Sequence, residues 1–386
     1  MTLLTALNLQ KFSNFSSNLQ KNWYLIAAAT LTVCNKPDEI PKIYHFVLQN
    51  ELNLKRSNKS NFNDLHNNVL RILNNFKELQ SNGEISIPNT NTNTNNTSNN
   101  AITNNNNVMK KFNLKSFDPY DNLPDYKLTN EDLLNQIIIT KKLRETILKS
   151  AALTGLPKAI NALSQLRDTT PYRILKILND DLNFDDSVYI DESADRDVKR
   201  RRIASGLQSS KAAPSESPSP SPSPSSEPSP IVFSSPEPSE SQKLTSSDIT
   251  DTTESPIVQK RKRVQTFEEF KDIQIRGYQF WKKIYGKVSL RVVNHLRTAN
   301  PDLWNYAIQN VYAPLLSYTD ILSAQETSLV IVACLVPQDV NPQLKGHLKG
   351  ALNNKVDLQT VRDARELAIE LSSLAGITWT GEVAKL

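Results

Sequence analysis

Apolar residues recur at helical spacing near the C-terminus of the chain. Five of them are separated by three or four positions in turn: Val361, Ala364, Ala368, Leu371 and Ala375. This spacing places them on one face of an α-helix. Asp357 precedes them with the side chain of an N-cap, and Gly376 follows as a suitable C′ residue. The pattern therefore predicts one amphipathic helix between these two residues.

Other apolar segments predict further helices. Trp23–Val33 is almost wholly apolar and is followed by a break at Pro37 and a second helical stretch through His45. In the last third of the chain, Leu322–Val336 has the composition of a buried helix, and Pro342–Leu352 predicts a shorter one. Few glycines, 9 in 386 residues, and few alternating β-branched runs favour helices over a sheet. We therefore expect an all-α fold.

A long helix is also expected in the middle of the chain. Leu143, Ile147 and Ala151 share one helical face. Gly155 and then Pro157 indicate that this helix ends and that a new one starts directly afterwards.

Two tracts have too little apolar area to offset the entropy of ordering them. Residues 81–107 are dominated by Asn and Thr, and residues 180–262 are acidic, then basic, then rich in Ser and Pro. Both are expected to be disordered connectors, the second with several phosphorylatable Ser-Pro sites. The predicted organisation is a first module in two parts (1–80 and 116–175) around an Asn-rich insertion (81–115), a linker (176–264), a C-terminal domain (265–381) and a targeting tail (382–386).

The two folded parts share an order of features that suggests an internal repeat. Each contains an apolar helix, then Cys-x-x-Pro, a helix with a histidine, and an Arg-Glu pair eleven residues before a glycine. The corresponding residues are Cys34 and Cys334, Pro37 and Pro337, His45 and His347, Arg144-Glu145 and Arg365-Glu366, and Gly155 and Gly376. Duplication of one helical module accounts for this shared order.

Charge and cysteine content restrict the functional classes. The formal net charge is only +5, and the basic residues gather in two short runs, Lys199–Arg202 and Lys260–Arg263. Nucleic-acid binding is therefore not expected, although such runs keep a nuclear location open. Two cysteines some 300 residues apart form neither a disulfide framework nor a zinc cluster. We predict no metal and no cofactor, and no apolar run reaches the length of a membrane span.

Three segments of the last part resemble the carboxymuconolactone decarboxylase family, which includes the AhpD-like proteins. They are RGYQFWKKIYGKV from Arg276, PDLWNYAIQNVYAPLLSYTDILS, and the segment from Glu326 to Gly376 with its HLKGALNN motif. The first part of the chain resembles the family faintly, through the segment LRETILKSAALTGLPKAINAL. The resemblance covers residues 265–380 and extends to a fungal peroxisomal group. It implies an AhpD-like helical bundle that forms homo-oligomers.

The resemblance also implies which chemistry to expect. The redox branch of the family has Cys-x-x-Cys-x-x-x-His, but Val340 and Gln343 stand at those cysteine positions before His347, and Asp38 and Pro41 before His45. Thiol peroxidase chemistry is therefore not expected. The decarboxylase branch uses a histidine and polar residues for proton transfer. The candidate catalytic residues are His347, Gln343 one turn earlier, and Glu326 on the preceding helix.

The chain ends in Ala384-Lys385-Leu386, a variant of the Ser-Lys-Leu peroxisomal signal. We expect an accessible tail, binding to the peroxisomal import receptor, and a location in the peroxisomal matrix, with the nucleus or cytoplasm as alternatives. Three functions stay open at this point. The chain is a decarboxylase-like or isomerase-like enzyme on a small organic acid or acyl compound, a non-catalytic oligomeric matrix protein for binding or assembly, or a nuclear regulator.

Overall fold

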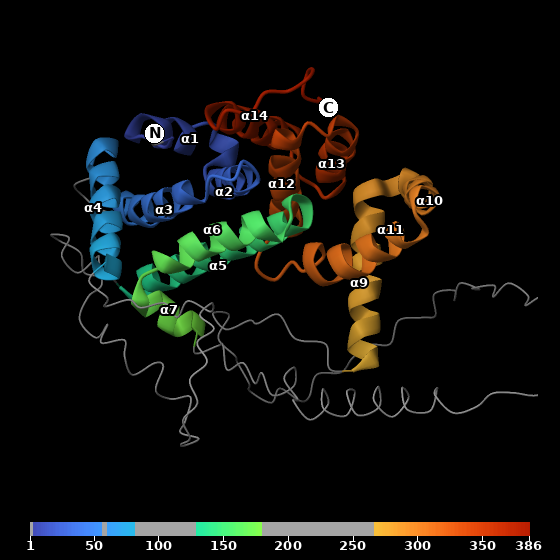
Figure 1. The fold of residues 1–386 in the computed structure, drawn as a ribbon, viewed down its shortest axis with the longest axis horizontal. Coiled ribbons are helices and arrows are strands. Elements are labelled where there is room, and N and C mark those ends of the chain that lie inside the picture. The colour runs from blue at the N-terminus through green and yellow to red at the C-terminus, as the bar shows by residue number, and fades with distance from the viewer. Residues whose placement is uncertain (1–2, 56–59, 82–128, 180–265) are drawn as a thin grey trace, which may run out of the picture. The chain divides into compact units, whose positions relative to one another are not determined.

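The computed structural model describes residues 3–55, 60–81, 129–179 and 266–386 (Figure 1). These residues form helices and connecting turns, with no strand among them, so the all-α prediction is confirmed. They belong to one compact unit that joins residues 1–181 to residues 255–386. We call residues 3–179 the N-terminal half and residues 266–386 the C-terminal half. No helix in these ranges is both long and apolar enough to cross a membrane.

The N-terminal half contains seven longer helices within the described ranges. They are α1 (Ala6–Ser13), α2 (Trp23–Val33), α3 (Ile40–Leu54), α4 (Phe62–Ser81), α5 (Asn130–Thr154), α6 (Leu156–Asp168) and α7 (Tyr172–Asn179). Two 3-10 turns, η1 (Ser17–Leu19) and η2 (Pro37–Glu39), precede α2 and α3. The predicted helix Trp23–Val33 has the predicted bounds. Helix α7 extends past residue 175 into the segment predicted as linker.

The described C-terminal half contains six α-helices and three other helical segments. They are α9 (Phe267–Tyr285), η7 (Gly286–Val288), α10 (Ser289–Ala299), α11 (Pro301–Tyr306), the π-helix η8 (Ala307–Leu316), α12 (Ala324–Leu335), η9 (Val336–Gln338), α13 (Asn341–Asn353) and α14 (Leu358–Leu374). Asp357 caps α14 through bonds to the backbone of Gln359 and Thr360, as predicted. The Asn-rich insertion, the Ser/Pro tract and both basic runs lie outside the described residues.

Local sequence signals explain where the long helices begin and end. Helices α5, α9 and α12 each begin with a capping box, in which the N-cap hydroxyl and an acidic side chain three residues later satisfy each other's backbone N–H groups. The N-caps are Thr129, Thr266 and Ser323. Gly155 and Gly376 end α5 and α14 with φ of 90°. Only glycine adopts this backbone region without strain.

Helix α9 crosses η8 very closely because of the Arg276-Gly277 pair. A Cβ atom on Gly277 would lie 2.4 Å from the Cα of Ala313, so no larger residue fits there. The neighbouring Arg276 donates hydrogen bonds to the Ala313 carbonyl at 3.2 Å and to the Ser317 hydroxyl at 3.0 Å. Pro314 lies within η8 and cannot donate a backbone hydrogen bond. Gly277 thus permits the close crossing of α9 and η8, and the hydrogen bonds of Arg276 hold the two helices together.

The two halves pack against each other in a reciprocal way (Figure 1). Helix α2 packs on α14, α12 packs on α5, and α2 and α12 pack on each other. Side-chain bonds cross the same boundary: the Thr30 hydroxyl bonds the Ala333 carbonyl at 3.4 Å, and the Cys334 thiol bonds the Ser150 hydroxyl at 3.3 Å. In the predicted repeat, α2 corresponds to α12 and α5 corresponds to α14. Each of α2 and α12 therefore packs on the α5 or α14 helix of the other half, as equivalent helices of two subunits do in a twofold dimer.

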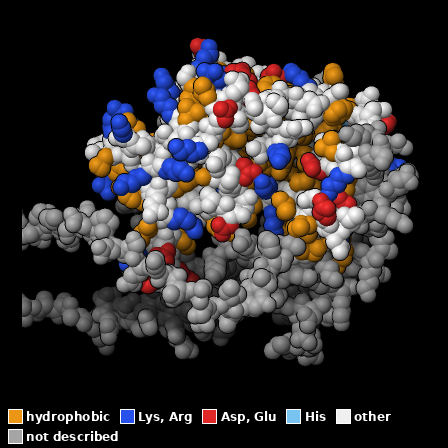
Figure 2. Space-filling view, turned by 180° about the vertical axis from the view of Figure 1, so that it is seen from behind, with side chains coloured by type: hydrophobic (Ala, Val, Ile, Leu, Met, Phe, Trp, Pro, Cys, Tyr) orange, Lys and Arg blue, Asp and Glu red, His pale blue; other side chains and the backbone are white. Residues whose placement is uncertain are grey.

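The surface of the described residues is mixed in character. Lys and Arg side chains occur over much of the face in Figure 2, with acidic and apolar side chains between them. Several large apolar side chains of the C-terminal half are exposed, among them Phe267, Leu290 and Tyr306.

Candidate functional site

His347 lies on α13, where the HLKGALNN motif joins this helix to α9 and α12. A Cβ atom on Gly350 would lie 2.7 Å from the Ile284 side chain, so the glycine lets α13 approach α9. The Asn353 amide donates to the Ile284 carbonyl at 2.8 Å, and the buried Asn354 amide donates to the Ser328 hydroxyl of α12 at 2.9 Å. The motif therefore fixes the position of His347 relative to both neighbouring helices.

Two tyrosines complete a buried polar cluster around His347. The Nε2 atom of His347, a residue only 8% exposed, lies 3.3 Å from the hydroxyl of Tyr285, the last residue of α9. That hydroxyl lies 3.2 Å from the hydroxyl of Tyr312, which is carried by η8. Trp281 packs against both tyrosines, with ring centroids 4.2 Å from Tyr285 and 4.7 Å from Tyr312. Tyr285 is half-buried, and the other members are buried.

Burial determines the charge state of this cluster. It lowers the pKa of His347 to about 4, because a buried imidazole loses the solvation of its charged form. Burial also raises the pKa of Tyr285 and that of Tyr312, while a hydrogen bond from Tyr312 partly lowers the pKa of Tyr285. At neutral pH the cluster is a neutral imidazole with two protonated phenols.

Glu326 is engaged elsewhere. It accepts the backbone N–H of Ser323 in the capping box of α12, and its other oxygen lies 2.5 Å from the Nζ atom of Lys142 on α5. Gln343 is exposed on the first turn of α13. Within the described ranges neither residue hydrogen-bonds to His347. The structure thus brings together His347 and two tyrosines, and it places Glu326 at the boundary between the halves.

His45, the predicted counterpart of His347, is a packed core residue. Its Nε2 atom lies 2.8 Å from the Thr169 carbonyl, and its ring packs against Tyr44 and Phe76 at 4.9 and 5.8 Å. Burial lowers the pKa of His45 to about 3. The residue therefore stays neutral and carries out a packing role.

Both cysteines are protonated at neutral pH. Burial raises the pKa of the Cys34 thiol to about 11 and that of Cys334 to about 12. A thiolate is the nucleophilic form of cysteine, so neither residue has the microenvironment of a reactive cysteine.

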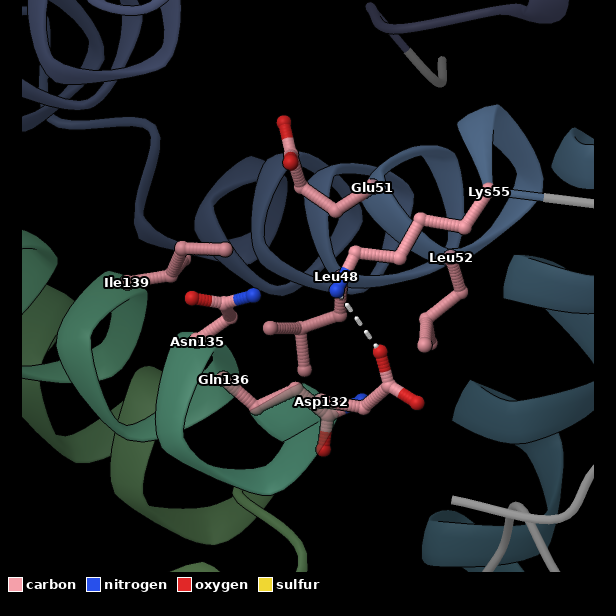
Figure 3. A pocket seen from close by; sticks show the side chains of 8 residues that line it. All are labelled: Leu48, Glu51, Leu52, Lys55, Asp132, Asn135, Gln136 and Ile139. Carbon is pink, nitrogen blue, oxygen red and sulfur yellow. Dashed lines mark hydrogen bonds and ion pairs between the residues drawn. The ribbon is translucent and has the colours of Figure 1, made fainter. Parts of the chain in front are cut away.

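Two hollows lie in the N-terminal half. A cavity of about 10 Å³ between α3 and α5, with room for one water molecule, is bridged by the 3.0 Å ion pair of Lys55 and Asp132 (Figure 3). A cleft of about 670 Å³ is lined by side chains that include Trp23, Tyr24 and Phe62. Its volume is in the range of small-molecule sites. Helix α13 lines neither of them.

Sequence reasoning missed Tyr285 and Tyr312 as neighbours of His347. Both lie in the quoted family segments, but they are 62 and 35 positions from His347 along the chain. Their meeting depends on the close crossing of α9 and η8 at Gly277 and of α13 and α9 at Gly350. The available signal was the presence of Gly277 and Gly350 inside predicted helical segments, because a glycine inside a helix often marks the close approach of another helix.

Comparison with known proteins gives two relatives. The chain is 34% identical to peroxisomal protein 2 of Saccharomyces cerevisiae over 393 residues, which covers 100% of this chain and 99% of that protein. It is 46% identical to peroxisomal protein 2 of Schizosaccharomyces pombe over 111 residues, 29% of this chain and 52% of that protein. No family model and no solved structure matches. The resemblance to carboxymuconolactone decarboxylases therefore stays a prediction. The chain belongs to the peroxisomal protein 2 family, and it is a protein of the peroxisome.

Proposed function

We propose that this chain is a matrix protein whose C-terminal half catalyses a decarboxylation or isomerisation of a small organic acid or acyl compound. The observation that carries the proposal is the hydrogen-bonded series His347, Tyr285 and Tyr312 in a buried part of the domain. Buried titratable groups with shifted pKa values and specific partners are typical of functional sites.

The arrangement suits Tyr285 as the group that faces a substrate. Its oxygen accepts a hydrogen bond from the Tyr312 hydroxyl, and, in the tautomer with the proton on Nε2, a second one from His347. Its own proton then remains available for a substrate oxygen. Tyr285 is also the member of the cluster that is only half-buried. His347 acts through Tyr285 and is a positioning residue in this scheme.

The proposed reactions depend on the Tyr285 hydroxyl as a hydrogen-bond donor to a substrate oxygen. When a β-oxo acid loses CO₂, the bond to the carboxylate carbon breaks and its electron pair moves onto the carbonyl oxygen as an enolate. A phenol that donates to this oxygen stabilises the developing charge, and the enolate carbon then takes a proton from solvent. In an isomerisation the enolate forms instead when a solvent base removes a proton from the carbon next to the carbonyl, and the carbon skeleton then takes up a proton at the new position; the same donor stabilises this enolate. Neither reaction uses a thiolate, which agrees with the protonated state of Cys34 and Cys334.

The test is turnover of a panel of small β-oxo acids, such as acetoacetate, followed by CO₂ release. We expect Tyr285→Phe to lower kcat by about 10²- to 10³-fold, as loss of an oxyanion donor does. Tyr312→Phe and His347→Gln should lower kcat less and shift the alkaline limb of the pH–rate profile, because both tune Tyr285. Tyr306→Phe, at an exposed position of α11, is the matched control and should leave kcat unchanged. Equal activity of Tyr285→Phe and the unaltered protein would overturn this assignment.

A second candidate is a non-catalytic oligomeric protein for binding or assembly. The observation in its favour is that Glu326, a predicted site residue, bonds to Lys142 and so joins the halves. If the panel shows no turnover, while light scattering after size-exclusion chromatography shows a stable homo-oligomer, this candidate replaces the first.

We also propose that Ala384-Lys385-Leu386 is the import signal. A receptor for such tripeptides reads a small residue, a cation and an apolar residue with its free carboxylate. Deletion of Leu386 should leave a fluorescently tagged chain in the cytosol. Unchanged co-localisation with peroxisomes after this deletion would exclude the tripeptide as the route.

A further inference from the structure

The tail that follows α14 folds back onto the C-terminal half. The Trp379 indole donates to the Val336 carbonyl at 2.7 Å, and the backbone N–H of Thr380 donates to Asp339 at 3.0 Å. Further along, Val383 is buried, with 6% of its surface exposed. The expectation of an accessible tail is therefore wrong for Val383 and Ala384, which are buried and half-buried, whereas Lys385 and Leu386 are exposed.

Two side chains hold the backbone of residues 382–384, and we call Asn341 and Arg365 the tail clamp. Arg365 donates from Nε to the Ala384 carbonyl at 2.6 Å and from Nη2 to the Val383 carbonyl at 2.5 Å. Asn341 accepts the Ala384 N–H at 2.6 Å and donates to the Glu382 carbonyl at 3.2 Å. Both backbone polar groups of Ala384 are thus occupied within the chain.

We propose that the tail clamp is an intramolecular binding site that competes with the import receptor for Ala384. The inference rests on the proposed import through the C-terminal tripeptide. Ala384 is its small residue and is half-buried, while Lys385 and Leu386 are exposed. A receptor pocket that encloses the whole tripeptide cannot enclose Ala384 while α13 and α14 cover it. The receptor binds the released tail only.

The contacts favour the docked tail. Arg365 is 6% exposed and has its guanidinium directed at two carbonyls of the tail. Release of the tail leaves these buried donors without their acceptors, and unmade bonds of a buried charged group are unfavourable. The apparent association constant for the receptor is therefore the association constant of the free tail multiplied by the fraction of molecules in which the tail is released.

The experiment compares three ligands for the peptide-binding domain of the import receptor by fluorescence anisotropy. They are a peptide of residues 381–386, the full chain, and the full chain with Arg365→Ala. We expect the peptide to bind about tenfold more tightly than the full chain and Arg365→Ala to recover most of that difference. Asn341→Ala should recover part of it and serves as a second variant should Arg365→Ala fail to fold. Arg362→Ala, exposed on the same helix, is the matched control and should behave as the unaltered chain.

The outcomes separate the two proposals. A peptide that does not bind the receptor contradicts import through the tripeptide. If instead the peptide binds and the unaltered chain binds equally tightly, or if folded Arg365→Ala and Asn341→Ala chains bind no better than Arg362→Ala, the tail clamp does not compete and the inference is wrong.

Discussion

Helices α5 and α14 carry the same Arg-Glu pair eleven residues before a glycine, but they bury opposite members of it. On α5, Glu145 is 4% exposed and lies 3.8 Å from the Nζ atom of the fully buried Lys149. On α14, Arg365 is the buried member, while more than half of the Glu366 side chain surface is exposed. The same dipeptide at the same spacing therefore does not determine which charge enters the interior.

The difference follows from the segments that cover each helix. On both helices a buried cation binds backbone carbonyls of an irregular segment, which has no helical partner for them. Lys149 donates to the Tyr318 carbonyl and to the Thr327 hydroxyl, each at 2.7 Å. On α14 the covering segment is the tail, and its carbonyls bind Arg365. On each helix the buried cation is therefore the one that reaches backbone carbonyls of the covering segment.

The largest effect is expected from removal of the cation on α5. Lys149→Ala should lower the free energy of unfolding by about 3–5 kcal/mol, because it leaves Glu145 and the bonded carbonyl buried without this partner. Arg365→Ala should lower it by only about 1–3 kcal/mol, because the carbonyls of the tail regain water. Urea denaturation of both variants measures the difference, with Lys349→Ala, exposed on α13, as the control. An equal loss in both variants would contradict the comparison.

The two histidine helices are expected to make stability depend on pH. His45 and His347 have folded-state pKa values of about 3 and about 4, below the ordinary value of 6.5. The unfolded chain therefore takes up protons first as the pH falls below 6.5, and stability present above that pH is lost.

Between pH 7 and pH 5 each histidine should lower the free energy of unfolding by about 2 kcal/mol. His45→Gln and His347→Gln should each remove its own share of this pH dependence, as measured by urea denaturation at both values. An unchanged slope in one variant means that the corresponding imidazole is solvated in the folded protein.

The smallest effects concern the glycines that end α5 and α14. Gly155 has φ 90° and ψ 157°, a conformation restricted almost to glycine, so Gly155→Ala should destabilise by about 2 kcal/mol. A Cβ atom on Gly376 would meet no other atom within 4 Å, and this glycine completes a C-terminal motif in which the Ile377 N–H donates to the Ser372 carbonyl. Gly376→Ala should destabilise by about 1 kcal/mol. Thermal unfolding should show a larger fall in Tm for Gly155→Ala than for Gly376→Ala. A larger fall for Gly376→Ala would contradict the prediction.

Local signals in the sequence predicted α2 in the N-terminal half and α12, α13 and α14 in the C-terminal half, whereas α10, α11 and η8 were not predicted individually. The helix Trp23–Val33, the N-cap Asp357 and the helix end at Gly376 depend on neighbouring residues only, and the structure agrees. The bounds of α12 and α13 differ from prediction by one or two residues. Helix α4 was not predicted individually, because its apolar residues are diluted by Asn and charged residues.

The candidate site was harder to predict, because its partners come from distant positions. The resemblance indicated His347, Gln343 and Glu326, and the involvement of each in catalysis stays a prediction. The geometry adds Tyr285 and Tyr312, whose proximity depends on two helix crossings. Side-chain types and periodicity give no information about which helices cross. The same holds for Lys142, which reaches Glu326 from 184 positions away.

The reciprocal packing of the halves has a consequence for how such a protein changes over time. In a symmetric dimer of identical chains every substitution occurs at two places at once, whereas here each half accumulates its own. Lys149 lies six residues before Gly155, and Glu370 lies six before Gly376. One is a fully buried cation and the other a partly exposed anion that pairs with Lys11. A single polypeptide permits such opposite charges at corresponding positions, because each half is encoded by its own codons.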